Sequence, residues 1–182
     1  AEGWRSVAPD DVLIERPMAD GGEGTLDAIA RARPDARRMP LRATGPDGRP
    51  VDAHWLLLTD ADGSLTGVVE LAATSGLTLI EEPLPVDAHT VGLGEAMLAA
   101  LEAGVDRLVI ALGGSALTDG GAGVLSALGA RLLDAAGRPV ARGLRGLSAL
   151  DRVATDALRP PPAGGAVILA DVDAPLLGPR GA

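Results

Sequence analysis

The chain contains no lysine, and this absence limits how it can handle phosphate. All 16 basic side chains among its 182 residues belong to Arg, so the P-loop pattern G-x-x-x-x-G-K-[ST], which needs a Lys, does not occur. Asn and Gln are also missing. A phosphate site in this chain therefore depends on backbone amides, Arg side chains and metal ions.

Cysteine is absent and aromatic side chains are scarce. Without Cys there is no disulfide and no thiolate metal site. Trp4 and Trp55 stand alone, with no Phe or Tyr, so a platform for stacking nucleic-acid bases has almost nothing to build on. The net charge of -9 also argues against a nucleic-acid partner.

Long apolar runs and a signal-peptide pattern are lacking as well, so we expect no membrane partner and a cytoplasmic location. Hydrophobic residues nevertheless make up 47% of the chain, which is enough to bury a sizeable core.

The first half of the chain alternates apolar segments with strong turn signals. Val12 to Glu15 reads as a short buried strand, and Thr25 is expected to cap a helix that Pro34 ends. An antiparallel meander is predicted next, with strands over 38–44, 51–58 and 67–73 and a turn at "TGPDGRP" (44–50).

The second half changes to longer helices and continuous apolar strands. Thr90 is expected to cap a helix that Gly104 closes. Buried strands are predicted over 107–112 and 166–176, with a helix around Val124, Leu125 and Leu128 between them. The whole chain is predicted to be a mixed α/β fold.

Three loops place glycines and acids directly after a predicted strand. Ligands of α/β sheets bind beyond the carboxyl ends of strands, and glycine lets the backbone approach them. Amides at a helix N-terminus suit a phosphate or carboxylate, whereas acids suit magnesium, a hydroxyl group or general-base work. The candidate residues are Asp20, Gly21, Gly22, Glu23, Gly24 and Thr25 in the first loop, Gly113, Gly114, Ser115 and Asp119 in the second, and Asp171 and Asp173 in the third.

Each loop alone also has a simpler interpretation, because Asp before a helix is a common cap and Gly a common turn residue. His54 is interpreted as a sheet-surface residue and His89 as a loop residue. Ser75 either binds an anion or ends a strand. Arg180 is either a phosphate-binding residue or a solvated one.

Six segments together resemble the bacterial type I glycerate kinases, in the same order and with the same spacing. The first is "PMADGGEGT" (17–25), the hallmark segment of that family. The others are "TGPDGRPV" (44–51), "ELAATSGL" (70–77), "HTVGLGEAMLAAL" (89–101), "LGGSALTDGGAGVLSALG" (112–129) and "ADVDAPLLGPRGA" (170–182).

The resemblance implies an enzyme that uses ATP and Mg²⁺ to phosphorylate D-glycerate to 2- or 3-phosphoglycerate. It implies a flavodoxin-like domain with an inserted mixed α/β domain and a cleft between them. Residues 1–40 would belong to the first domain and 41–182 mostly to the inserted one. It assigns catalysis to Asp20, Glu23 and Asp171, binding of substrate or phosphate to the glycines with Thr25, Ser115, Asp119 and Arg180, and metal binding to Asp173. Whether the protein forms a homo-oligomer stays open.

Three positions depart from the family pattern. Leu117 and Thr118 stand where the family has Thr-Asn, and Ala174 stands where it has Asn. An alternative function therefore stays open, namely a non-catalytic or altered-specificity relative that binds a small organic acid. The family also carries an Asp-Ser-Phe-Lys motif that would precede Ala1, so this chain is expected to be the front-central part of a longer kinase.

Overall fold

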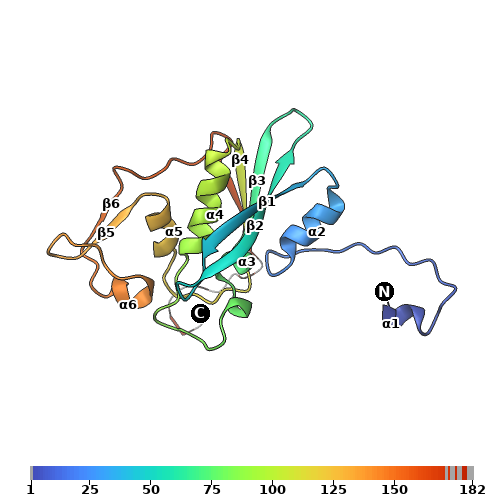
Figure 1. The fold of residues 1–182 in the computed structure, drawn as a ribbon, viewed down its shortest axis with the longest axis horizontal. Coiled ribbons are helices and arrows are strands. Elements are labelled where there is room, and N and C mark those ends of the chain that lie inside the picture. Colours follow the sequence, from blue (N-terminus) through green and yellow to red (C-terminus); the bar gives the residue numbers. More distant parts are fainter. Residues whose placement is uncertain (1, 171, 173–174, 176–177, 180–182) are drawn as a thin grey trace.

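A computed structural model describes residues 2–170, 172, 175 and 178–179. Within them, a sheet of five strands runs through the molecule in the order β1-β2-β3-β4-β7 (Figure 1). The first three strands are antiparallel, whereas β3, β4 and β7 are parallel, so these three end at the same edge. The bounds are β1 Arg37–Thr44, β2 Pro50–Thr59, β3 Leu65–Glu70, β4 Arg107–Ala111 and β7 Ala166–Leu169.

Helices cover both faces of this sheet. On one face, Trp55 and Leu57 of β2 pack with Leu93 of α4. On the other, Leu56 of β2 packs with Leu26 of α2. Successive side chains of a strand point to opposite faces, so a strand between two helices needs a continuous apolar run. The helices are α1 Glu2–Arg5, α2 Thr25–Ala32, α3 Leu71–Ser75, the 3-10 helix η1 Leu77–Leu79, α4 Val91–Glu102, α5 Ala122–Ala127 and α6 Gly143–Leu147.

A short hairpin-like pair stands beside the main sheet. It consists of β5 (Arg131–Leu133) and β6 (Arg152–Ala154), which pair antiparallel. It lies near α5 and α6 in Figure 1, away from the edge where β3, β4 and β7 end.

The mixed α/β class, the antiparallel meander and the "TGPDGRP" turn are confirmed. In that turn the amide of Gly45 donates to the carbonyl of Arg49 at 2.7 Å, and Gly48 has a φ of 86°, which favours glycine. The predicted helix after Thr90 and the strand from Arg107 are also present.

Three element predictions are wrong. Val12 to Glu15 forms no strand: Val12 is 90% and Ile14 73% exposed, because no strand in the described part of the chain pairs with this segment. The third meander strand ends at Glu70, where α3 begins. Finally, β7 is short and not buried: Ile168 is 60% exposed, and among the described residues β7 pairs with β4 alone.

The structure joins residues on both sides of the predicted domain boundary at residue 40. Helix α2 precedes that boundary, yet it packs against Leu56 and Val68 of the sheet that follows it. The two-domain division therefore stays a prediction. Among the residues that the structure describes, no helix is long and apolar enough to cross a membrane.

Candidate functional site

The first two glycine-rich loops touch each other, backbone against backbone. A Cβ atom added at Gly113 would lie 2.5 Å from Gly22 Cα, and one added at Gly21 would lie 2.6 Å from the carbonyl oxygen of Leu169. Real Cβ atoms do not approach other atoms so closely, so only glycine fits at either position. Leu169 ends β7 and Gly113 follows β4 closely, which places the contact at the common carboxyl edge of the parallel strands.

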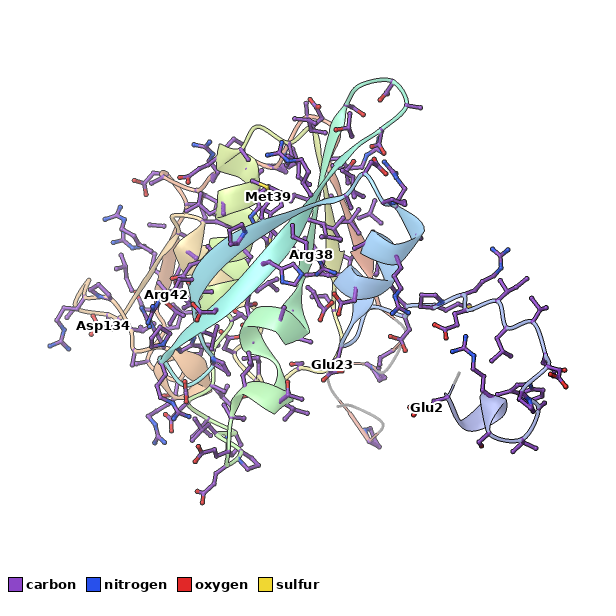
Figure 2. The ribbon with its side chains drawn as sticks, turned by 45° about the vertical axis from the view of Figure 1, so that its right-hand side comes forward. Glu2, Glu23, Arg38, Met39, Arg42 and Asp134 are labelled. Atoms are coloured by element: carbon purple, nitrogen blue, oxygen red, sulfur yellow. The ribbon has the colours of Figure 1, made fainter. Side chains whose placement is uncertain are left out.

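Glu23 reaches across to the second loop. A Cβ atom at Gly114 would overlap the Glu23 carboxylate, and Gly114 has a φ of 62°. The side chain of Glu23 is exposed on the loop before α2 (Figure 2). Its carboxylate forms neither a salt bridge nor a hydrogen bond with any other described residue. Glu23 is therefore held beside the second loop by packing, with both oxygens available.

Asp20 lies at the start of the same loop and is also exposed. Its Oδ1 accepts a hydrogen bond from the amide of Gly22 at 3.0 Å, a local turn that leaves Oδ2 open. The hydroxyl of Thr25 donates to the carbonyl of Gly22 at 2.8 Å, which fixes the other end of the loop. Two exposed carboxylates, Asp20 and Glu23, thus flank a loop of defined shape.

Glu70 closes the N-terminus of α2 from a distant strand. Its two carboxylate oxygens accept hydrogen bonds from the amides of Gly24 at 3.2 Å and Leu26 at 2.9 Å. The side chain is 6% exposed. The expectation that Thr25 caps α2 is wrong: the capping position is Gly24, and the acceptor is supplied by Glu70, 46 residues further along the chain.

This contact also settles which amides of the first loop are already used. The amides of Gly22 and Gly24 donate to Asp20 and Glu70, whereas those of Gly21 and Glu23 donate to no described residue. Sequence reasoning missed Glu70, because the predicted strand over 67–73 placed it within the strand, whereas in the structure it is the last residue of β3.

Two backbone hydrogen bonds hold the second loop against residues 75–77. The carbonyl of Gly114 accepts from the amide of Leu77 at 2.9 Å, and the amide of Ala116 donates to the carbonyl of Ser75 at 3.3 Å. By contrast, the amides of Gly113, Gly114 and Ser115 donate to no other described residue. Three successive free amides next to a strand end are an arrangement that binds anions. Ser75 itself is fully buried beneath this loop.

Asp119 lies in the second loop, but its oxygens are occupied. Oδ2 accepts from the amide and the hydroxyl of Thr90, both at 2.9 Å, and from the amide of Gly123 at 3.0 Å. Oδ1 accepts from the amide of Gly121 at 3.1 Å. The Thr90 hydroxyl in turn accepts from the amide of Val124. Asp119 is 1% exposed and binds the start of α4 to the start of α5.

The two histidines lie outside these loops. His54 is on the sheet surface as expected, with its Nε2 2.6 Å from Nη1 of Arg38. His89 precedes α4 as expected, but it is 3% exposed, and its Nδ1 has no hydrogen-bond partner among the described residues. Burial lowers the pKa of His89 below its usual value of 6.5, and the charge of Arg142 lowers that pKa further.

The remaining predicted residues are Asp171, Asp173 and Arg180, and they lie outside the described residues. Within the residues that are described, no cluster of three or more His, Asp or Glu side chains could hold a metal ion. Asp20 and Glu23 nevertheless fit Mg²⁺, because this ion commonly takes only one or two protein carboxylates and completes its shell with phosphate and water oxygens.

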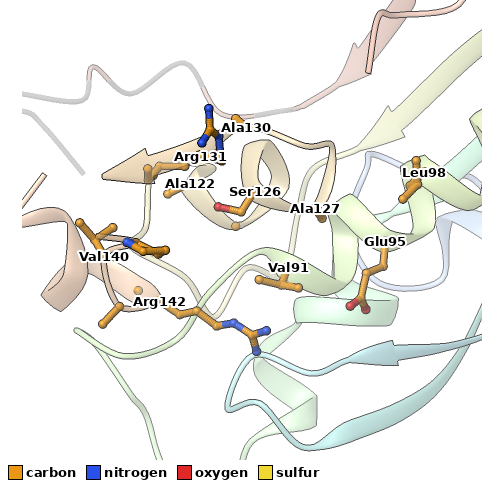
Figure 3. A pocket seen from close by; sticks show the side chains of 15 residues that line it. Val91, Glu95, Leu98, Ala122, Ser126, Ala127, Ala130, Arg131, Val140 and Arg142 are labelled. Atoms are coloured by element: carbon orange, nitrogen blue, oxygen red, sulfur yellow. The ribbon is translucent and has the colours of Figure 1, made fainter. Parts of the chain in front are cut away.

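A separate pocket of about 540 Å³ lies between α4, α5 and residues 139–143 (Figure 3). Glu95 and Arg142 line it, but the Glu95 carboxylate already accepts from the amide and the hydroxyl of Thr44 at 2.6 and 2.8 Å. None of the residues predicted for the site lines this pocket.

The profile of the Glycerate kinase family matches residues 1–182, and the chain belongs to this family. It is 42% identical over 183 residues to the Glycerate kinase of Bacillus subtilis (strain 168), which covers 99% of this chain and 47% of that protein. It is 40% identical to the Glycerate 2-kinase of Escherichia coli (strain K12), over 100% of this chain and 47% of the relative.

A solved structure agrees with these relatives. The putative glycerate kinase 2 from Salmonella typhimurium LT2 superimposes with a TM-score of 0.82 at 37% identity, and the match covers 98% of this chain and 48% of that one. The chain therefore spans about half the length of the relatives it matches.

Proposed function

We propose that the protein carrying this chain is a glycerate kinase that transfers the γ-phosphoryl group of ATP to D-glycerate and forms 2- or 3-phosphoglycerate. One observation carries the proposal: two glycine-rich loops meet backbone to backbone at the carboxyl edge of the parallel strands, although the touching residues Gly22 and Gly113 are 91 positions apart in sequence. They bring free amides and exposed carboxylates together, and phosphoryl transfer needs positioning and charge neutralisation above all.

The free backbone amides of the two loops bind different ligands. Those of Gly113, Gly114 and Ser115 bind phosphate oxygens of the nucleotide, because they face no acceptor of their own. Those of Gly21 and Glu23 lie in the first loop and bind the glycerate carboxylate. Gly22, Gly24 and Thr25 shape that loop rather than contact substrate, since their polar groups already bond within the protein.

The two exposed acids take the remaining roles. Asp20 or Glu23 accepts the proton of the glycerate hydroxyl that attacks the phosphoryl group, and the other would hold Mg²⁺. The bound ion would neutralise phosphate charge, which lowers the repulsion between the anionic substrates and these acids. Asp171 is proposed as a second hydroxyl partner, Asp173 as a metal ligand, Arg180 as a phosphate ligand and Asp119 as the residue that holds the second loop.

The test measures ADP release in a coupled assay with D-glycerate and Mg-ATP. Asp20→Asn and Glu23→Gln are compared with Asp52→Asn, an exposed β2 residue outside the loops. We expect the general base to lose at least about 100-fold in kcat and the control to stay at the wild-type value. If both loop variants keep wild-type turnover while folded, neither acid does the chemistry.

The departures at Leu117 and Thr118 support the alternative of altered substrate specificity. Thr118 donates its hydroxyl to the carbonyl of Pro85, so it serves the loop and not a ligand. A panel of small hydroxy acids in the same assay separates the two functions. A hydroxy acid turned over with higher kcat/KM than D-glycerate favours the alternative, and binding without turnover of any acid favours a non-catalytic protein.

A further inference from the structure

A second pocket adjoins the second glycine-rich loop at Ser115, next to Gly113 and Gly114. It has a volume of about 540 Å³ and is lined by Ser115 and Leu117 of that loop together with apolar residues of α4, α5, β4 and β7. The volume lies within the roughly 300–1,000 Å³ of typical ligand pockets. One wall of this pocket is therefore part of the loop that is proposed to bind phosphate.

The lining suits a flat, uncharged heterocycle. The pocket is bounded by aliphatic side chains such as Leu93, Ile110 and Val124, which offer apolar contact to a ring. Met97 adds a thioether, and sulfur makes favourable contacts with aromatic rings. The pocket therefore offers apolar contact to a base in a chain that lacks Phe and Tyr altogether.

Polar groups at the pocket rim are few and have defined roles. Asp119 lines the pocket, and its oxygens accept hydrogen bonds from Thr90 and from the amides of Gly121 and Gly123, which hold its carboxylate against the protein backbone. The Ser115 oxygen accepts from the amide of Leu117 at 3.2 Å, which leaves its hydroxyl hydrogen for a ring nitrogen.

We propose that this pocket binds the adenine base of ATP, with the phosphates extending onto the Gly113–Ser115 amides. This inference rests on the proposed kinase function and adds the position of the nucleotide to it. It also gives a role to Leu117: an aliphatic side chain at this position of the loop enlarges the apolar contact with the base.

The decisive variant fills the pocket without touching the amides. Leu117→Trp, made in the protein that carries this chain, is compared with Leu144→Trp, since Leu144 is 43% exposed on α6 and lines no part of the pocket. Calorimetry measures the Kd of Mg-ATP and of Mg-tripolyphosphate, which has the phosphates but no base. The coupled assay measures KM for ATP and for D-glycerate.

We expect Leu117→Trp to raise the Kd and the KM for ATP at least tenfold while the Kd of tripolyphosphate and the KM for D-glycerate change less than about twofold. Unchanged ATP binding, or an equal loss of ATP and tripolyphosphate, overturns the inference. If the Trp variant does not fold, Leu117→Ala replaces it; loss of the aliphatic contact should then weaken binding of ATP alone by about tenfold.

Photolabelling with 8-azido-ATP provides an independent readout. Label on the peptide that contains Met97 or Leu117 supports the site, and label confined to other peptides overturns it. The proposed kinase function is tested by a different measurement: it is wrong if the wild-type protein forms no ADP from D-glycerate and ATP. In that case the tripolyphosphate and photolabelling measurements still show whether the pocket binds a nucleotide.

Discussion

Glu70 is the most informative residue to change, because it connects the β3 strand to the first glycine-rich loop. The carboxylate is buried and accepts one hydrogen bond on each oxygen, from Gly24 and Leu26. Hydrogen bonds to charged groups contribute about 1.5–3 kcal/mol each. In Glu70→Gln the side-chain oxygen still accepts one of these hydrogen bonds, but the NH₂ group faces the other backbone N–H, and two donors cannot bond. One hydrogen bond to a charged group is therefore lost, and we expect the free energy of unfolding to fall by about 1.5–3 kcal/mol.

The same substitution should reduce catalysis beyond its effect on stability. The amides of Gly24 and Leu26 position the loop that carries Glu23, and small misplacements of reacting groups cost about 100-fold in rate. We expect kcat for D-glycerate phosphorylation to fall at least about tenfold in folded Glu70→Gln protein, with the Kd for tripolyphosphate in the absence of Mg²⁺ unchanged. That anion is proposed to bind the second loop, which Glu70 does not contact.

Urea denaturation and the coupled ADP assay measure these effects. Glu102→Gln is the matched control, because Glu102 is exposed at the end of α4, and it should change stability by less than about 0.5 kcal/mol. The reasoning is refuted if Glu70→Gln unfolds at the same urea concentration as Glu102→Gln. Lost stability with wild-type kcat refutes only the positioning role.

Three further predictions concern the second loop and the buried histidine. Asp119→Ala removes four hydrogen bonds and should lower the free energy of unfolding by about 3 kcal/mol or more in urea denaturation; a loss below 1 kcal/mol, roughly the value of one neutral hydrogen bond, contradicts it. Gly113→Ala places a Cβ atom 2.5 Å from Gly22 Cα, so it should destabilise the fold by about 1–3 kcal/mol and reduce kcat. Gly3→Ala is the control, because nothing lies within 4 Å of its added Cβ atom, and it should change neither quantity. Equal unfolding curves of the two variants would show that the loops do not touch. The folded state holds His89 with a lowered pKa, so the unfolded chain binds its proton more readily, and stability should fall as the pH drops below 6.5 toward the folded pKa. His89→Gln should reduce this pH dependence, and an unchanged difference between the unfolding free energies at pH 8 and pH 5 argues against it.

Much of the fold could be predicted because its signals are local. The "TGPDGRP" turn, the meander and the helix from Val91 to Glu102 follow from glycine turns and from apolar spacing along a short stretch of chain. Val12 to Glu15 shows where this reasoning stops. An apolar run indicates a strand only when another strand pairs with it, and the sequence does not show the partner.

The sequence determined which residue types the candidate site contains. Glycines, acids and the lack of Lys at positions 20–25 and 113–119 are properties of the chain itself, and they restrict phosphate binding to amides, Arg and metal ions. The six motifs and their order also indicated the family, because both can be read along the chain without knowing which residues lie close together in the fold.

Only the tertiary structure decided how these residues divide the work. Asp119 and Glu23 look alike in the sequence, yet one is buried among four hydrogen bonds and the other is exposed against Gly114. Glu70 replaces Thr25 as the residue that closes α2. The physical reason is that hydrogen-bond partners 29 to 46 residues apart are set by how strands and helices pack, and local sequence patterns carry no information about that packing.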